Sequence, residues 1–221
     1  MKDIVLQAKN LHKSYKTPDN LQILKGISLT LKKNESIAIM GSSGAGKTTL
    51  LHILGTLESF DSGEISILDS ACSDNEIRNK HIGFIFQSYN LLEDLTLLEN
   101  ILIPALIARK NIASKSIANK RAFLLLKEVG LTKRKNHLAK ELSGGEKQRA
   151  TIARAFLNDP DIILADEPSG NLDFENSKII HKLLIESVKK YNKSLIVATH
   201  DKKLASLCDK IFYLENGKFL K

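Results

Sequence analysis

A chain of 221 residues, 43% of them hydrophobic and 26% charged, is long enough to bury the core of one compact domain. No stretch approaches the roughly 20 uninterrupted apolar residues of a membrane-spanning helix, so we expect any membrane role to come through a partner. The net charge of +8 comes with lysines scattered along the chain and without interleaved aromatic residues, which argues against a nucleic-acid-binding surface.

The cysteines and the N-terminus bear on the cellular compartment. Cys72 and Cys208 stand far apart and lack the spacing of a zinc site, so we expect two free thiols. The first residues offer no apolar signal region followed by a small-residue cleavage site. The sequence therefore predicts a protein that stays in the cytoplasm.

Strand-like segments dominate the first forty residues. The runs at 4–8 and 27–31 lie on either side of a polar turn at 17–20, which predicts an antiparallel β flap. The next run, at 37–40, leads into the core of the domain.

Three later segments, at 82–86, 162–165 and 195–198, are short and almost continuously apolar. Such runs are typical of parallel strands that are buried on both faces, with helices between them. We therefore expect an α/β fold with a mostly parallel sheet, whose ligands lie at the carboxyl ends of the strands.

The middle of the chain, from about residue 89 to 142, contains no convincing strand. Apolar residues recur with helical spacing at 97–110 and 116–129, and Gly130 is a suitable helix terminator. This pattern predicts a helical lobe inserted into the α/β core.

A glycine-rich loop follows the strand at 37–40 and precedes an apolar helical segment. It has the Walker A pattern, Gly41-Ser42-Ser43-Gly44-Ala45-Gly46-Lys47-Thr48, and continues with Thr49. Its glycines let backbone N–H groups face phosphate oxygens, and the following helix adds its N-terminal dipole. We expect Lys47 to reach the β- and γ-phosphates of a nucleotide and the Thr48 hydroxyl to bind Mg²⁺.

Two carboxylates, Asp166 and Glu167, end the strand at 162–165. Because side chains alternate along a strand, these neighbours point in different directions and can do different work. Asp166 suits the Mg²⁺ shell, and Glu167 suits a general base beside the γ-phosphate.

Two polar residues follow other predicted strands. His200 comes after the run at 195–198 and can donate a hydrogen bond to a phosphate, although a lone histidine is more often an ordinary surface residue. Gln87 comes after the run at 82–86 and can touch Mg²⁺ or the attacking water, although its spacing alone favours an ordinary exposed glutamine. We interpret the other five histidines as surface residues: His12, His52, His81, His137 and His181.

Residues 142–149 contain a helix N-terminus with two unusual glycines. Ser143 and Glu146 have capping-box spacing, while Gly144 and Gly145 lower the helix propensity of the first turn by up to ~1 kcal/mol each. Such glycines are understandable if the bare backbone approaches an anion. Because the chain already has a phosphate loop, we expect this second site to serve the nucleotide of another subunit.

The segment 142–149 resembles the signature motif of ABC ATPases, and the other motifs follow in that family's order over essentially the whole chain. The resemblance implies a P-loop NTPase (RecA-like) core of residues 1–88 and 155–221, with residues 89–154 as the helical signature subdomain. It also implies ATP and Mg²⁺ as cofactors. It assigns adenine stacking to Tyr15, the Q-loop to Gln87, catalysis to Glu167 with Lys47, the D-loop to Asp173, the switch to His200, and the clamp on the partner's γ-phosphate to Ser143, Gly144 and Gly145.

Within that family, the segments 98–101 and 165–173 are most similar to lipoprotein-releasing, LolD-type subunits and their MacB- and FtsE-type relatives. Ser169 stands where that group usually has threonine. The resemblance implies a homodimer beneath integral membrane permease subunits, peripheral to the cytoplasmic face of the inner membrane, that powers lipoprotein release without touching the cargo.

Three alternatives remain open. The first two are the ATPase subunit of a MacB-like exporter and that of an FtsE-like mechanotransmission complex. A more remote one is a soluble ABC ATPase of DNA repair or translation, which would normally carry a coiled-coil insertion or tandem halves.

A final expectation concerns the permease. The segment 88–104 carries many apolar side chains beside Gln87. We interpret some of them, around Leu92 and Leu95, as a groove for a short cytoplasmic helix of the membrane partner.

Overall fold

The computed structural model describes residues 3–16, 21–68, 70–71 and 75–220. The turn predicted at 17–20 and Cys72 lie outside these residues. Cys208 is a free thiol, as expected, and burial raises its pKa to about 12.

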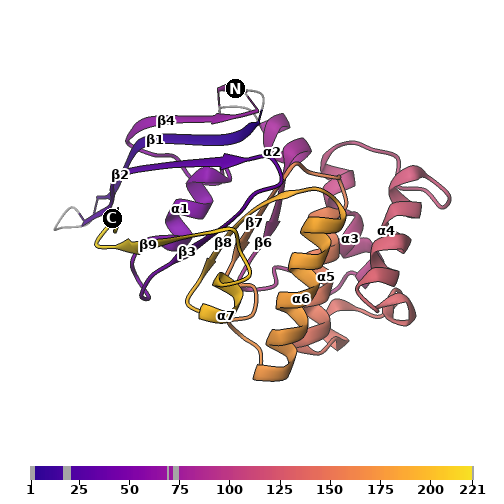
Figure 1. Ribbon diagram of the computed structural model, residues 1–221. Coiled ribbons are helices and arrows are strands. Elements are labelled where there is room, and N and C mark those ends of the chain that lie inside the picture. The colour runs from indigo at the N-terminus through magenta and orange to yellow at the C-terminus, as the bar shows by residue number, and fades with distance from the viewer. Residues whose placement is uncertain (1–2, 17–20, 69, 72–74, 221) are drawn as a thin grey trace.

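A six-stranded sheet forms the centre of the molecule (Figure 1). Its strand order is β10 (Lys218–Phe219), β9 (Lys210–Glu215), β3 (Ser36–Met40), β8 (Ser194–Thr199), β7 (Ile162–Asp166) and β6 (Ile82–Ile85). All neighbouring pairs are parallel except β10 and β9. This confirms the mostly parallel sheet, although the two C-terminal strands were not predicted.

Alternation along the central strands sorts their side chains into two cores. On β3, Ile37 and Ile39 pack with helix α1 (Lys47–Leu54) and with the N-terminal strands, whereas Ala38 and Met40 pack with the helices on the other face. The other central strands, β7 and β8, alternate in the same way. Burial on both faces explains why these strands are almost continuously apolar.

The predicted flap is confirmed as part of a larger antiparallel sheet. Its order is β2 (Leu21–Lys32), β1 (Ile4–Tyr15), β4 (Ser62–Ile67) and β5 (Ser70–Ala71). Helix α1 lies between this sheet and the central sheet (Figure 1). Strand β4 was missed because its first three residues are exposed, which leaves only Ile65 and Ile67 as buried markers.

Helices cover the other face of the central sheet. The longer ones are α3 (Leu97–Ile107), α4 (Ile117–Glu128), α5 (Gly144–Phe156) and α6 (Phe174–Lys190), and the shorter ones are α7 (Lys202–Ala205) and the 3₁₀ turns η1 (Thr132–Arg134) and η2 (Ala139–Glu141). Helix α2 (Asn75–His81) lies on the side of α1 instead, where Ile77 packs against the core formed with the N-terminal strands. Helices α5 and α6 lie next to the sheet, and α3 and α4 lie beyond them (Figure 1). The subdomain boundary proposed between residues 154 and 155 falls inside α5 and stays a prediction.

Local signals explain where the helices of this region end. Ser116 caps α4 by accepting a hydrogen bond from the Asn119 N–H, and Gly130 follows the helix with a φ of +70°. The helix predicted at 97–110 is shorter, because Arg109 adopts a φ of +53° and Lys110 N–H donates to the Ala105 carbonyl. A left-handed residue with this hydrogen bond ends a helix even without glycine.

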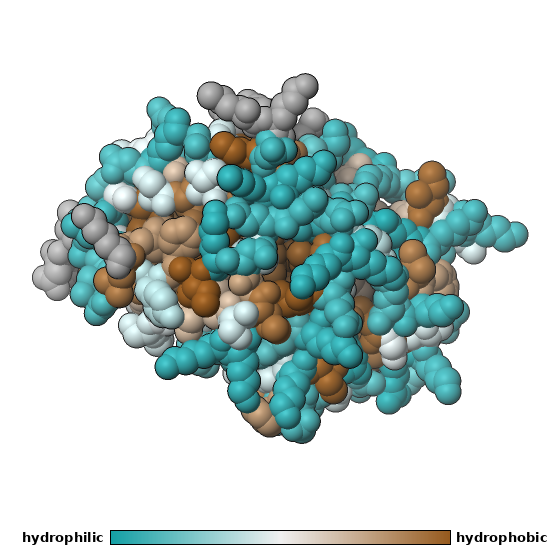
Figure 2. Space-filling view, in the orientation of Figure 1, coloured by the Kyte–Doolittle hydropathy of each residue, from teal (hydrophilic) through white to brown (hydrophobic). Residues whose placement is uncertain are grey.

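Hydrophilic side chains cover most of the face seen in Figure 2, with hydrophobic residues in small separate patches. Among the described residues, no helix is both long enough and apolar enough to cross a membrane.

Candidate functional site

The carboxyl ends of four parallel strands meet at one edge of the central sheet. Met40 at the end of β3 pairs with Thr199 at the end of β8, and Asp166 at the end of β7 pairs with Ala198. The glycine-rich loop, Glu167 and His200 follow the ends of β3, β7 and β8 directly, and Gln87 lies two residues after the end of β6. The fold therefore gathers at one edge residues that lie up to about 160 positions apart in the sequence.

The glycine-rich loop has backbone conformations that favour glycine. Gly44 and Gly46 have φ values of +79° and +99°, and Gly46 is the left-handed residue from which α1 begins. A Cβ on Gly41 would lie 2.4 Å from the Leu214 carbonyl oxygen, so the loop also passes close to β9. No described side chain caps α1, which leaves its first N–H groups available to an anion.

Lys47 lies across the opening of this loop. Its Nζ donates to the carbonyl oxygens of Gly41 at 2.9 Å and Ser42 at 3.1 Å. The same Nζ lies 3.7 Å from Oε1 of Glu167. The loop thus surrounds a buried cation. This cation faces the carboxylate of Glu167, which follows β7, and β8 lies between β7 and β3 in the sheet.

Glu167 is held from both sides. Its Oε2 lies 2.9 Å from Nδ1 of His200 and accepts from the Thr199 hydroxyl at 3.3 Å. Its backbone has a φ of +42°, and its N–H donates to the Ala198 carbonyl. A left-handed conformation is uncommon for a residue with a Cβ and persists only where the surroundings maintain it.

Asp166 is buried directly beneath Glu167. Burial raises the pKa of its carboxyl group, whereas the nearby Thr48 side chain, His52 and Lys47 lower it. Its Oδ1 has no hydrogen-bond partner among the described residues. A buried oxygen of this kind usually has a partner, which points to an ion or water at this place.

A cleft of about 790 Å³ opens over these groups. It is lined by Ser43, Gly44, Gly46, Lys47, Thr48, Thr49, Gln87, Glu167 and His200, together with Leu21 and Ile23. Nine of the residues predicted from sequence therefore share one cleft. Leu21 and Ile23 were not predicted, because nothing in the strand pattern of β2 tells which of its side chains will face another element.

Tyr15 does not line this cleft within the described part of the chain, but it lies next to it. It is the cross-strand partner of Leu21, and its hydroxyl donates to Oε1 of Glu58 at 2.6 Å. Burial and this hydrogen bond raise the pKa of Tyr15. Lys13 Nζ lies 5.3 Å from the centre of the ring, and Tyr15 is 37% exposed.

The predicted capping box at the start of α5 is present. Ser143 Oγ accepts from the Glu146 N–H at 3.3 Å, and Glu146 Oε2 accepts from the Ser143 N–H at 2.9 Å, which lowers the pKa of Glu146. A Cβ on Gly144 would lie 2.9 Å from the Tyr89 hydroxyl, and one on Gly145 would lie 2.8 Å from the Asn176 side chain.

The signature residues stand apart from the cleft. Within the described residues, none of Ser143, Gly144 and Gly145 lines it. Asp173 caps α6 instead, accepting from Asn176 N–H at 2.9 Å and from its side-chain amide at 2.7 Å, and these bonds lower the pKa of Asp173. The remaining loop residue, Ala45, packs against the core beneath the loop.

The groove expected at Leu92 and Leu95 stays a prediction. Leu92 is exposed, and a groove of about 220 Å³ is lined by Phe84, Phe86, Ile103, Pro104 and Ile107, of which Ile103 and Pro104 belong to the segment 88–104. Buried Asn100 fixes the segment from Leu92 to Leu95 as a turn, because its side chain donates to the carbonyls of both residues.

Comparisons with known proteins agree with this geometry. Residues 24–170 match the family model described as "ABC transporter". The "Lipoprotein-releasing system ATP-binding protein LolD" of Protochlamydia amoebophila is 48% identical, over 97% of this chain and 95% of that protein. The protein of the same name from Cytophaga hutchinsonii is 45% identical, over 96% and 97%.

Solved structures give the same result. The dimeric structure of MJ0796, a bacterial ABC transporter cassette, is 38% identical and superposes with a TM-score of 0.89 over 98% of this chain and 97% of that one. A post-hydrolysis dimer of MJ0796 bound to ADP and Pi is 37% identical, with a TM-score of 0.88 and the same coverage. The chain therefore belongs to the ABC transporter family, as an ATP-binding and ATP-hydrolysing subunit of the LolD type.

Proposed function

We propose that two copies of this protein bind beneath an integral membrane permease, on the cytoplasmic face of the inner membrane, and power the release of lipoproteins toward the outer membrane. The observation that carries the pairing is the separation of Ser143, Gly144 and Gly145 from the cleft that contains Lys47 and Glu167. One copy then lacks half of a nucleotide site. The LolD relatives named above support the lipoprotein cargo.

ATP fits the cleft by charge and shape. We assign its β- and γ-phosphates to Lys47 and to the uncapped N-terminus of α1, where backbone N–H groups and the helix dipole favour an anion. Binding then replaces the contacts of Lys47 with the carbonyls of its own loop. The adenine is assigned to the exposed ring of Tyr15, beside Leu21 and Thr49.

The residues beside the phosphates also suit Mg²⁺. Thr48 offers a hydroxyl and Asp166 an unpartnered, buried carboxylate oxygen, and both are the hard oxygen ligands that this ion prefers. The described residues contain no group of three or more His, Cys, Asp or Glu side chains that could hold a metal alone. This fits an ion that keeps waters and takes other ligands from phosphates. Bound there, Mg²⁺ would neutralise phosphate charge.

Hydrolysis is assigned to the residues that face the phosphates. Glu167 accepts a proton from the attacking water, and His200, which contacts Glu167 Oε2, orients this carboxylate and the γ-phosphate. Gln87 lines the cleft from the segment that leads into the helical lobe, so it can report the presence of the γ-phosphate to that lobe.

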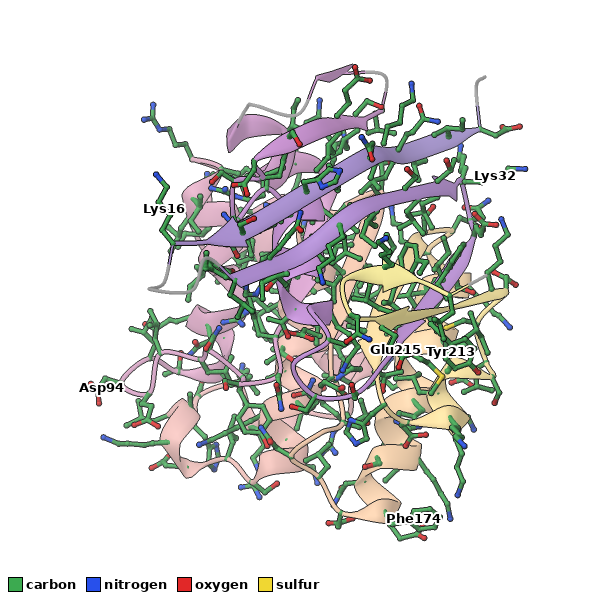
Figure 3. All side chains as sticks on the ribbon, turned by 90° about the vertical axis from the view of Figure 1, so that its left-hand side faces the viewer. Lys16, Lys32, Asp94, Phe174, Tyr213 and Glu215 are labelled. Carbon is green, nitrogen blue, oxygen red and sulfur yellow. The ribbon has the colours of Figure 1, made fainter. Side chains whose placement is uncertain are left out.

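Pairing places the signature of one copy over the cleft of the other. Ser143 and the first turn of α5 then supply a second helix N-terminus to the γ-phosphate. Asp173 directly precedes Phe174, which is 57% exposed at the end where α6 begins (Figure 3). An exposed aromatic ring beside Asp173 is consistent with a surface that a second copy covers.

The permease is assigned to the groove that contains Phe86 and Ile107. Phe86 directly precedes Gln87, and Arg154 of α5 donates to the carbonyl oxygens of Tyr89 and Asn90. The groove is thus tied both to the cleft and to the signature helix. A short apolar helix of the permease would fit it.

Reconstitution tests the cargo. The protein is co-purified with its membrane subunits, placed in vesicles that contain a lipid-modified lipoprotein, and supplied with ATP. We expect ATP-dependent transfer of the lipoprotein to a soluble acceptor, and no transfer with Lys47→Ala. Stimulated ATP hydrolysis without any transfer would instead favour an exporter of other substrates or a mechanotransmission complex.

The docking groove has a matched control. Ile107 lines the groove and is 67% exposed, whereas Leu92 is 56% exposed and lies outside it. Ile107→Asp should weaken association with the membrane subunits and leave basal ATP hydrolysis unchanged, and Leu92→Asp should change neither. Equal effects of the two substitutions would contradict this assignment of the groove.

A further inference from the structure

One histidine is buried behind the cleft and joins the two loops that form its floor. His181 lies two turns into α6 and is only 5% exposed, contrary to the surface position expected from sequence. Its Nε2 lies 2.7 Å from Oγ of Ser169, two residues after Glu167. The same nitrogen lies 3.8 Å from Oδ2 of Asp201, the residue after His200.

These contacts close a ring around Glu167. Its carboxylate accepts from the Thr199 hydroxyl, and the Asp201 N–H donates to the same hydroxyl oxygen at 3.0 Å. Asp201 lies against His181, and His181 is hydrogen bonded to Ser169. Ser169 returns to Glu167 along two peptide bonds. The loop after β7 and the loop after β8 therefore meet on both sides of the catalytic carboxylate, behind it through the Ser169–His181 hydrogen bond and the 3.8 Å contact between His181 and Asp201.

The link behind is made by a buried imidazole ring. Burial lowers the pKa of His181, Asp201 raises it and Lys203 lowers it, and burial is the largest of these effects. A buried imidazole needs a hydrogen-bond partner, and Ser169 supplies one. Asp201 is itself oriented, because its Oδ1 accepts from the N–H groups of Lys203 and Leu204 at the start of α7.

The loop after β7 needs such support. Glu167 has a left-handed backbone, and Gly170, three residues later, has no side chain with which to fix the turn. A Cβ added to Gly170 would lie 3.4 Å from the Cβ of Glu167. Besides Ser169, the buried residue in this turn is Pro168, whose side chain has no hydrogen-bonding group. The Ser169 hydroxyl is thus the polar anchor of the turn on the side away from the cleft.

We propose that His181 is a positioning residue for ATP hydrolysis, which holds Ser169 and Asp201 together so that Glu167 and His200 meet at the γ-phosphate. The proposal rests on the roles proposed above for Glu167 and His200. It extends them to a residue that does not line the cleft. A loss of the link would move the carboxylate without touching the residues assigned to nucleotide binding.

Two substitutions of His181 form a matched pair. Glutamine and methionine have unbranched side chains of similar length, but only glutamine can hydrogen bond to Ser169. We expect His181→Met to lower kcat on the order of 10- to 100-fold with little change in the KM for ATP, since a small misplacement of a reacting group has effects of this size. His181→Gln should recover most of the rate.

Substitutions of Ser169 test the same link from its other end. Ser169→Ala should lower kcat like His181→Met, whereas Ser169→Thr, which keeps the hydroxyl, should not. The double variant Ser169→Ala with His181→Met should be no slower than either single variant, because both remove one contact. Thermal unfolding of each variant separates a loss of folding from a loss of rate.

The results that overturn the proposal are equally specific. Wild-type kcat in both His181→Met and Ser169→Ala, or equal losses in the methionine and glutamine variants, would leave His181 as an ordinary core residue. Glu167→Gln is measured in parallel. If Glu167→Gln still hydrolyses ATP, the role of Glu167 itself is wrong. If it is inactive while His181→Met is fully active, the proposal for His181 alone fails.

Discussion

Replacing Glu167 with glutamine tests whether Glu167 is the general base for ATP hydrolysis in the cleft. The glutamine oxygen can still accept from the Thr199 hydroxyl and the His200 N–H, which both contact Oε2 at 3.3 Å. The amide nitrogen would then face Lys47 Nζ, 3.7 Å from the present Oε1. The amide loses the attraction to Lys47, so the two retained contacts at the oxygen must hold the side chain in place, and the amide cannot take a proton from water.

The size of the effect follows from this geometry. A positioned general base contributes about 10²- to 10⁴-fold to a rate, which corresponds to ~3 to 5 kcal/mol of barrier. We therefore expect kcat to fall by that factor, while ATP still binds because Lys47 and the loop glycines are unchanged. Phosphate release measures the rate, and calorimetry measures the binding.

The unhydrolysed ATP should also hold two copies together. Size-exclusion chromatography with ATP should show Glu167→Gln as a dimer, and without ATP as a monomer. Glu35→Gln is a matched control, because Glu35 is similarly buried, at 12% against 11% exposure, and pairs with Lys210 at 2.6 Å. It directly precedes β3, at the sheet edge opposite the cleft. A Glu167→Gln protein that hydrolyses ATP at the rate of Glu35→Gln would refute the reasoning.

Three further predictions concern the loop and the core. Lys47→Ala should abolish tight binding of Mg-ATP in calorimetry, and an unchanged affinity would contradict the phosphate assignment. Gly41→Ala should destabilise the protein in urea by ~1 to 3 kcal/mol, because its Cβ would lie 2.4 Å from the Leu214 carbonyl oxygen. Because the pKa of His181 is lowered from 6.5 by burial, the unfolded chain takes up the proton first, and folding stability should fall as the pH drops below about 6.5. His181→Gln should lose less stability over that window, and an equal loss would refute the explanation.

The parts of the fold that the sequence predicts are those with local signals. Strands buried on both faces appear as apolar runs, and the glycine-rich loop is recognisable because its backbone conformations require glycine. Strand β9 carries an apolar run, Ile211-Phe212-Tyr213-Leu214, that was not used to predict it. Only Leu214 of this run is buried in the structure, so β9 differs from the strands that are buried on both faces.

The parts of the site that the sequence does not predict depend on contacts between distant segments. Leu21 and Ile23 line the cleft because β2 lies over the loop, and the sequence around them does not indicate this contact. His181 carried a weak signal, since it lies on α6 between Ile180 and Leu184, both fully buried. Helical spacing would have placed it on the buried face, but only the fold reveals that Ser169, 12 residues away, is its partner.

The two signature glycines have a role within one chain as well as the one proposed between two. A side chain on Gly144 would meet the hydroxyl of Tyr89, which follows Gln87, and one on Gly145 would meet Asn176, which binds Asp173. The first turn of α5 is therefore packed between the segments that leave the ends of β6 and β7. Those segments also carry cleft residues. If this turn contacts the γ-phosphate held by a second copy, packing contacts therefore connect it to the cleft, and so to the nucleotide, of its own copy. This contact gives a physical basis for the two sites of a pair to respond together, without any change in the core of the sheet.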